Sequence, residues 1–307
     1  MKRVSCSNVS HVFSRKIKPA VIAKPGENIV FETLDARGGR SVPGQRYSPP
    51  PHRPREELNP ATGPAYIEEA EPGDALAVEI KSIEPGKWGF VSAHPTVGVL
   101  KTWIKDAVDR AVRVEEGTVY FSKDMTFPTR PMIGTIGVAP AEREIQTIDP
   151  GIHGGNMDCN DVVVGSTVYL PVFVRGALLA MGDIHAFMGD GEISGGGLDI
   201  SADVEAKINL LKGVNIHRSL IETEEHFVFT YNAGDLKTAV RGVVGEAVKH
   251  LSSRLNLSLE DAIMLVSTAG DVMICQACDG PIDVVTRLRI PKEVFPGNGH
   301  IFGKNQP

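Results

Sequence analysis

The chain has 307 residues, of which 42% are hydrophobic and 23% charged, and its formal net charge is −6. This length exceeds the ~100–200 residues of a typical domain, which predicts two lobes and a large core. The mixed, slightly acidic charge disfavours nucleic-acid binding, which calls for a basic patch. The basic N-terminal stretch, residues 1–19, contains no apolar segment of the secretory kind, so we expect a cytoplasmic protein.

Residues 38–64 form the first long segment without apolar periodicity, and they contain seven prolines. Long loops within compact domains are often functional. We hypothesise a lid over the site or an arm that reaches a partner subunit, with a surface excursion of no role as the alternative. A second loop is expected at 87–101, where Trp88, Phe90 and His94 either line a small apolar pocket or pack beneath the loop.

Alternation of apolar and polar residues predicts strands at 75–81, 204–210, 226–231 and 286–290. The apolar block 162–181 is as long as a membrane span, but it is interrupted by Gly165, Pro171 and Arg175. Two short buried strands, within 162–172 and 176–183, explain the block better, and we expect no membrane partner. Turn clusters with many of the 32 glycines and 21 prolines separate these strands, which favours antiparallel sheets in a sandwich or barrel.

An apolar stripe from Leu236 to Leu255 predicts a helix with Asp235 as its N-cap. A second helix is expected after Ser258. We therefore predict a mainly β fold with a smaller α+β part. Residues 1–214 would be the main β domain with the site, 215–290 a small α+β lobe, and 291–307 a segment that returns to the β domain.

The cysteines, Cys6, Cys159, Cys275 and Cys278, are too few for a disulfide framework. A single CxxC at 275–278, without a second pair or a neighbouring histidine, is weak evidence for zinc. We expect these two residues to be small apolar groups at a strand end. Cys159 is kept as an alternative nucleophile, because cysteine paired with histidine is a recurrent catalytic arrangement.

The segment from Gly154 to Asp199 carries acids, an asparagine and a histidine in glycine-rich turns at both ends of the apolar block. Asn156 and Asp158 are two residues apart, as are Asp183 and His185, so each pair would point to one side of an extended chain. Glu192 follows in the sequence GDGE. Asn and Asp also favour turns for their own sake, so each residue alone has a purely structural interpretation.

These residues resemble the acetamidase/formamidase family in GGNMD at 154–158, GSTVYLPV at 165–172 and GDIHAFMGDGE at 182–192. Residues 31–39, 59–80 and 131–140 are similar to the family as well. The resemblance implies a β-sandwich or barrel-like fold, hydrolysis of a small amide to carboxylate and ammonia, a metal-associated site and a homodimer. One departure is Asp199, where the family leads us to expect glutamate.

We hypothesise that Asp158 and His185 bind a divalent metal with Asp35 as a third ligand. Glu192 would be the general base and then acid, and Asn156 would orient the carbonyl or hold the oxyanion. Asp183, His153 and Asp199 are candidates for substrate binding. Imidazole with carboxylates suits Zn²⁺, with Ca²⁺ as the second choice.

Two rivals to a small-amide hydrolase are kept. The same pocket in a non-catalytic protein would bind a metal or small molecule. A different metal-dependent hydrolase or deaminase would act on a related group.

Overall fold

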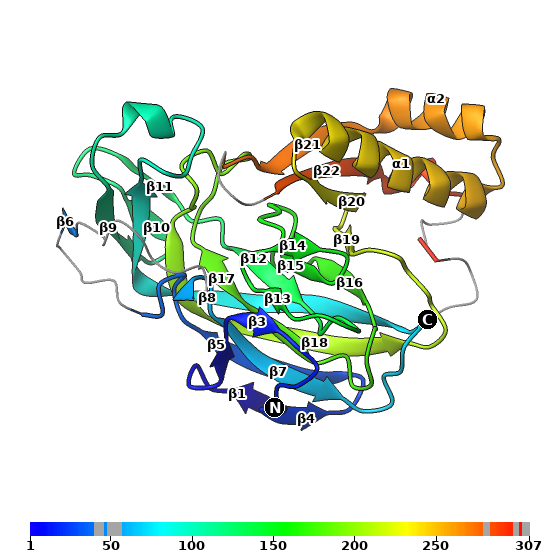
Figure 1. Cartoon of the computed structure of the whole chain (residues 1–307), viewed down its shortest axis with the longest axis horizontal. Helices are drawn as coiled ribbons and strands as arrows, with labels where there is room; N and C mark the ends of the chain where they lie inside the picture. The colour runs from blue at the N-terminus through cyan, green and yellow to red at the C-terminus, as the bar shows by residue number, and fades with distance from the viewer. Residues whose placement is uncertain (40–45, 48–56, 279–282, 297–300, 303–307) are drawn as a thin grey trace.

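The computed structural model describes residues 1–39, 46–47, 57–278, 283–296 and 301–302. Within these ranges the chain is mainly β, with one large curled sheet and a separate pair formed by β3 and β13 (Figure 1). The strands before residue 215 are β1 (Lys2–Val4), β2 (Val9–Ser10), β3 (Val12–Phe13), β4 (Val21–Ala23), β5 (Glu27–Thr33), β6 (Arg46–Tyr47), β7 (Ala61–Ile67), β8 (Ala75–Ala93), β9 (Val108–Glu115), β10 (Thr118–Tyr120), β11 (Thr126–Pro128), β12 (Met132–Gly137), β13 (Ile145–Gln146), β14 (Pro150–Gly151), β15 (Gly154–Asn156), β16 (Thr167–Pro171), β17 (Leu179–His185) and β18 (Asp199–Leu211). The elements that follow are β19 (Leu220–Glu222), β20 (His226–Ala233), α1 (Leu236–Leu255), α2 (Leu259–Ala269), β21 (Asp271–Gln276) and β22 (Val284–Pro291), and short 3₁₀ turns lie at Lys101–Trp103 and Lys292–Val294.

The longest ladder of the sheet joins β8 to β18 in antiparallel register, and it contains the predicted strands 75–81 and 204–210. Both strands run further than predicted. The expected loop at 87–101 is wrong over 87–93, where β8 continues. Pairing with β9 and β18 carries the strand past Pro85 and Gly86, and a register shift in the ladder accommodates them. Phe90 is buried in this extension, whereas Trp88 is exposed.

The prediction of two short strands in the apolar block 162–181 is confirmed by β16 and β17. The first strand begins at Thr167 and not at 162. Residues 163–166 turn back on themselves, because Ser166 Oγ donates to Val163 O and accepts from Val163 N. All seven residues of β17 are buried. Among the described residues, no helix combines the length and apolarity that crossing a bilayer requires.

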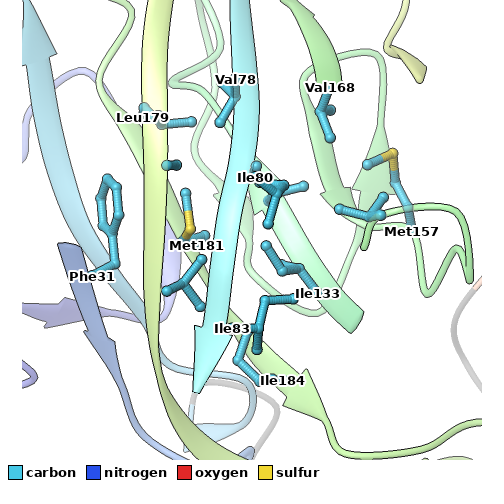
Figure 2. Packing of buried hydrophobic residues seen from close by; sticks show 14 of the residues in the cluster. Phe31, Val78, Ile80, Ile83, Ile133, Met157, Val168, Leu179, Met181 and Ile184 are labelled. Carbon is cyan, nitrogen blue, oxygen red and sulfur yellow. The ribbon is translucent and has the colours of Figure 1, made fainter. Parts of the chain in front are cut away.

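Figure 2 shows the apolar core that supports the strands of the site. Ile80 of β8, Ile133 of β12 and Ile184 of β17 pack together with Leu179 and Met181. All five side chains are completely buried. The strand ends that carry the polar residues of the site therefore rest on a tightly packed base, which limits how far they can move.

The two helices lie together over β20, β21 and β22, away from β1, β4 and β7 (Figure 1). The predicted caps are confirmed. Asp235 accepts a hydrogen bond from Thr238 N, and Ser258 Oγ accepts one from Asp261 N. This part has an apolar cluster of its own, in which α1 and α2 pack on β20 and β22. The predicted combination of a mainly β fold with a smaller α+β part is thus confirmed.

The strands after residue 214 belong to the same sheet, because β19 pairs with both β16 and β20. Near the C-terminus, Phe302 packs edge-to-face on Tyr169 of β16 with ring centroids 4.8 Å apart. The division into domains at 1–214, 215–290 and 291–307 stays a prediction. We call the part built from β19 to β22 with α1 and α2 the second lobe.

Much of the predicted loop 38–64 lies outside the described residues, namely 40–45 and 48–56. Residues 46–47 form the short strand β6, and Ala61 already begins β7, so the loop is shorter than predicted at its C-terminal end. The lid hypothesis stays a hypothesis. The described end of this segment, Asn59, takes part in the site.

Candidate active site

Four neighbouring strands, β15, β12, β17 and β18, bring the polar residues to one place through their register. β12 pairs with β15 on one side, where Thr135 lies opposite Asn156, and with β17 on the other, where Met132 lies opposite His185. β17 in turn pairs with β18, which sets His185 opposite Asp199. Residues far apart in the sequence thus meet at the ends of adjacent strands.

A buried group of Asp158, Asp183 and His185 has the composition and spacing of a metal site. One ligand atom from each residue lies within 4.8 Å of the others. His185 Nε2 is 3.6 Å from Asp183 Oδ1 and 3.0 Å from Asp199 Oδ1. Two of the three predicted metal ligands, Asp158 and His185, are therefore brought together with Asp183, which the sequence suggested for substrate binding.

The residues of this group fit a divalent cation. Asp158 Oδ1 is buried and has no hydrogen-bond partner among the described residues. Gly134 of β12 faces the group so closely that a Cβ there would lie 2.5 Å from Asp158 Oδ1 and 2.8 Å from Asp183 Oδ2. Glycine leaves room for the two carboxylates, whose oxygens with an imidazole nitrogen are ordinary ligands of divalent metals.

Several site residues have an unfavourable backbone conformation. The φ angles of Asn59, Asp158, Asp183 and Glu192 are 46°, 46°, 55° and 44°. L-residues rarely adopt this left-handed region, and such strain concentrates at functional sites where the surrounding structure enforces it. Asn and Asp tolerate this region better than other L-residues, so Glu192 is the residue that the fold holds most clearly against local preference.

Asn156 is the centre of a hydrogen-bond network. Its Oδ1 accepts from Thr135 Oγ1 at 2.5 Å and from Asn59 Nδ2 at 3.0 Å, and its Nδ2 donates to Asp158 Oδ2 at 2.7 Å. Asn59 Nδ2 also donates to Asp183 Oδ2 at 2.8 Å. These contacts orient both carboxylates. The prediction that Asn156 holds the substrate carbonyl or oxyanion stays a prediction, because its observed partners are residues of the protein.

Glu192 is buried, and its pKa is raised to about 7 by burial, with Asp183 and Asp199 adding to burial and His185 opposing it. A carboxyl group with a pKa near neutrality is able both to accept and to donate a proton at physiological pH. Perturbed carboxyls of this kind are typical of catalytic acids and bases.

The other ionisable groups influence one another strongly. Burial raises the pKa of Asp158 well above its ordinary value, and the charge of Glu192 adds to this. Burial also raises the pKa of Asp199 to about 6, against the opposing effect of His185. Burial alone would lower the pKa of His185, but Asp183 and Asp199 outweigh it and raise that pKa. The excess of buried acids favours binding of a cation.

Two predicted site residues, Asp35 and His153, are not members of this group. Asp35 Oδ1 accepts hydrogen bonds from the backbone N–H groups of Arg37 and Gly39, each at 2.9 Å, and so stabilises its own turn. His153 is fully buried and packs edge-to-face on Phe13 with ring centroids 5.0 Å apart. Burial lowers the pKa of His153 to about 3, which keeps the ring neutral. The roles of Asp35 in metal binding and His153 in substrate binding stay predictions.

Cys159 has the properties of a structural thiol. It is completely buried, and burial raises its pKa well above the ordinary value, with the neighbouring Cys275 adding to the effect. A nucleophilic cysteine needs a lowered pKa and access to the substrate. The environment of Cys159 therefore disfavours the alternative of a cysteine nucleophile.

Sequence reasoning missed Asn59, Thr135, Gln276 and Cys278 as neighbours of the site. Asn59 begins the family-like segment 59–80, which was a usable signal. Gln276 Nε2 donates to Asn156 O at 3.0 Å, and Cys278 Sγ lies 3.3 Å from Glu192 Oε2. Gln276 carries no local signal, and the CxxC motif marked Cys278 only as a small apolar residue at a strand end, because both residues reach the site from the second lobe.

Fold and site together define a mainly β protein with a buried Asp–Asp–His group beside an acid of raised pKa. The model of the Acetamidase/Formamidase family matches residues 5–145 and 141–297, and the chain belongs to this family. It is 24% identical over 248 residues to a formamidase of Methylophilus methylotrophus, covering 62% of this chain and 61% of that protein. It is 28% identical over 219 residues to an acetamidase of Mycolicibacterium smegmatis, covering 50% and 53%. The chain thus spans about half to three fifths of the length of these relatives.

Solved structures are similar over nearly the whole chain. An acetamidase from Bacillus halodurans superposes with a TM-score of 0.92 at 34% identity, over 97% of this chain and 100% of that chain. A recombinant predicted acetamidase/formamidase from Thermoanaerobacter tengcongensis gives a TM-score of 0.91 at 34% identity, over 97% and 98%. The family resemblance seen in the sequence is confirmed.

Proposed function

We propose that this protein hydrolyses the C–N bond of a small aliphatic amide, of the formamide or acetamide type, to a carboxylate and ammonia. The observation that carries the proposal is the buried Asp158–Asp183–His185 group with Glu192 beside it. Membership of the acetamidase/formamidase family supports it.

Asp158, Asp183 and His185 would hold a divalent metal in this proposal. When bound, such a metal polarises the carbonyl and lowers the pKa of water toward ~7. One imidazole with two carboxylates suits Zn²⁺ better than Ca²⁺, which prefers a shell of oxygens alone. Asn156 and Asn59 keep the two carboxylates in position through the hydrogen bonds described above.

Glu192 would move the proton. As a carboxylate it accepts a proton from the attacking water, and as the acid it donates that proton to the departing nitrogen, which is a poor leaving group without it. A pKa of about 7 suits both halves of this exchange. Asp199 supports the site by its contact with His185. As an aspartate it is one methylene shorter than the glutamate that the family leads us to expect.

Assembly as a homodimer and location in the cytoplasm stay predictions from the sequence and the family resemblance. Gel filtration with light scattering tests the first, and fractionation of cells that produce the protein tests the second.

The test of the proposed function is ammonia release from formamide, acetamide, propionamide and urea, before and after chelation, with metal content measured on the same sample. We expect release from at least one short amide, with loss of release on chelation and its return with added metal. His185→Ala should lose both metal and ammonia release. Metal-loaded wild-type protein that releases no ammonia from any of these compounds contradicts the proposal.

A further inference from the structure

The end of β21, in the second lobe, lies directly against the turn that carries Glu192. Gly191 N donates to Ile274 O and Cys275 O at 3.1 and 3.0 Å, and Ala277 N donates to Gly191 O at 2.9 Å. Gly191 and Gln276 form a parallel bridge. The backbone of the second lobe is therefore hydrogen-bonded to the residue next to the proposed general base.

Side chains of the same segment reach the site itself. Gln276 is fully buried and donates to Asn156 O. Cys278 is buried as well, and its Sγ lies 3.3 Å from Glu192 Oε2 and 3.3 Å from Gln276 Oε1. These three residues form a chain of contacts that links the general base to the asparagine that orients Asp158.

The Cys278 side chain is a hydrogen-bond donor in this setting. Burial raises the pKa of its thiol, and the negative charges of Glu192 and Asp158 raise it further. The group therefore stays a thiol, with one S–H proton to donate and little capacity as a nucleophile. A donor on one carboxylate oxygen fixes the rotation of the carboxylate and hence the direction of the other oxygen.

We propose that Cys278 is a positioning residue for Glu192: its S–H group holds Oε2 so that the other oxygen is aimed at the reacting water and nitrogen. This inference rests on the proposed function. It gives the second cysteine of the CxxC a specific task that differs from metal binding or disulfide exchange.

The first cysteine of the motif provides a matched control. Cys275 is buried like Cys278 and lies three residues away, but its Sγ accepts from Arg287 Nη1 at 3.7 Å and its neighbour is Cys159. The described contacts of Cys275 do not include Glu192. Replacing either cysteine by alanine removes one buried sulfur, and only one of the two replacements removes the donor to Glu192.

The test compares Cys278→Ala, Cys278→Ser and Cys275→Ala in the intact chain with the best amide substrate. We expect Cys278→Ala to lower kcat by ~10–100-fold, because misdirected proton transfer affects the chemical step. KM and metal content should stay near wild type. Cys278→Ser restores a donor and should recover part of kcat, while Cys275→Ala should stay within about twofold. A Cys278→Ala variant with wild-type kcat, or a Cys275→Ala variant with the same loss, overturns the proposal.

An infrared measurement tests the contact without catalysis. The S–H stretching band of Cys278, isolated by subtracting the spectrum of Cys278→Ala, should lie at the lower frequency of a bonded thiol and move when Glu192 is replaced by alanine. An S–H band whose frequency is unchanged by this replacement also overturns the proposal. If wild-type protein releases no ammonia while the band moves, the proposed function fails and the contact stands, so the two failures are distinguishable.

Discussion

The sheet before residue 215 and the second lobe contribute different kinds of residue to the site. The first region supplies the groups proposed to react or bind: Asp158, Asp183, His185 and Glu192. The second lobe supplies residues that hold them, Gln276 and Cys278 among them. The difference teaches that the groups proposed to react and the residues that hold them are encoded in distant parts of the chain, so the second lobe belongs to the candidate site.

Arg287 of β22 joins the two regions. Its side chain is almost fully buried and forms ion pairs of 2.8 Å with both Asp161 and Asp190. Asp161 lies three residues after Asp158, and Asp190 lies two before Glu192. One guanidinium of the second lobe therefore ties together the two turns that carry these acids.

The largest effect on the rate of amide hydrolysis is expected at Glu192, which lies in the region before residue 215. Glu192→Gln keeps the shape of the side chain and removes its proton transfer, so kcat should fall by ~10²–10⁴-fold while metal content is retained. Rates of ammonia release and metal analysis on the same samples check this. Glu144→Gln, at an exposed carboxylate bonded to Ser14, is the control and should change little. A Glu192→Gln variant with substantial activity excludes Glu192 from the role.

The second prediction concerns the stability that the ion pairs of Arg287 give to the fold. Arg287→Ala leaves Asp190 without its guanidinium partner and deprives the buried Asp161 of one of two, so the free energy of unfolding should drop by about 3–5 kcal/mol. Arg289→Ala should cost clearly less, because Arg289 is 27% exposed and Asp161 keeps Arg287. Urea unfolding of both variants gives the comparison. Equal losses would show that Arg287 has no special part in joining the regions.

A smaller effect is expected on the pH dependence of metal binding. Asp199 and Glu192 have pKa values raised to about 6 and about 7, and that of Asp158 is raised as well, so protons must leave these acids when a cation binds. Affinity should therefore rise with pH around these pKa values, by about tenfold per pH unit for each proton released. Calorimetry in buffers of different ionisation enthalpy measures the protons released. Metal binding without proton release across this range contradicts the proposed arrangement.

The smallest effect is expected at an acid outside the site. Asp74 accepts from Lys212 Nζ at 2.6 Å and Gly213 N at 2.8 Å, and these contacts overcome burial and lower its pKa. A lowered pKa means that this stabilisation is present above the unfolded pKa, which is near 3.8, and is lost as the pH falls through the folded value. Asp74→Asn should cost about 1–3 kcal/mol at pH 7 and much less near pH 3.

Unfolding of wild type and Asp74→Asn at several pH values provides the measurement. Amide hydrolysis at pH 7 should stay near wild type, because these contacts of Asp74 with Lys212 and Gly213 lie at the end of β18 and involve none of the candidate site residues. A difference in unfolding free energy between wild type and Asp74→Asn that grows as the pH falls would contradict the predicted pH dependence.

Local patterns in the sequence predicted much of this protein. The helices at Asp235 and Ser258 followed from caps and apolar spacing, because these depend on residues within one or two turns. Asp158, His185 and Glu192 stood out because glycine-rich turns and i, i+2 spacing are local features. The mainly β class and the family followed from such segments as well.

Tertiary structure decided the rest. The extension of β8 through Pro85–Gly86 depends on pairing with β9 and β18, which no local propensity reveals. Asp183 meets Asp158 at a place where Gly134 of β12 lies against both carboxylates and Asn59 donates to Asp183 Oδ2. Gln276 and Cys278 reached the site through a bridge between segments some 85 residues apart, Gly191 and Gln276. The sequence by itself determined which residues are chemically able to act, and only the packing of strands distant in the sequence determined which of them meet.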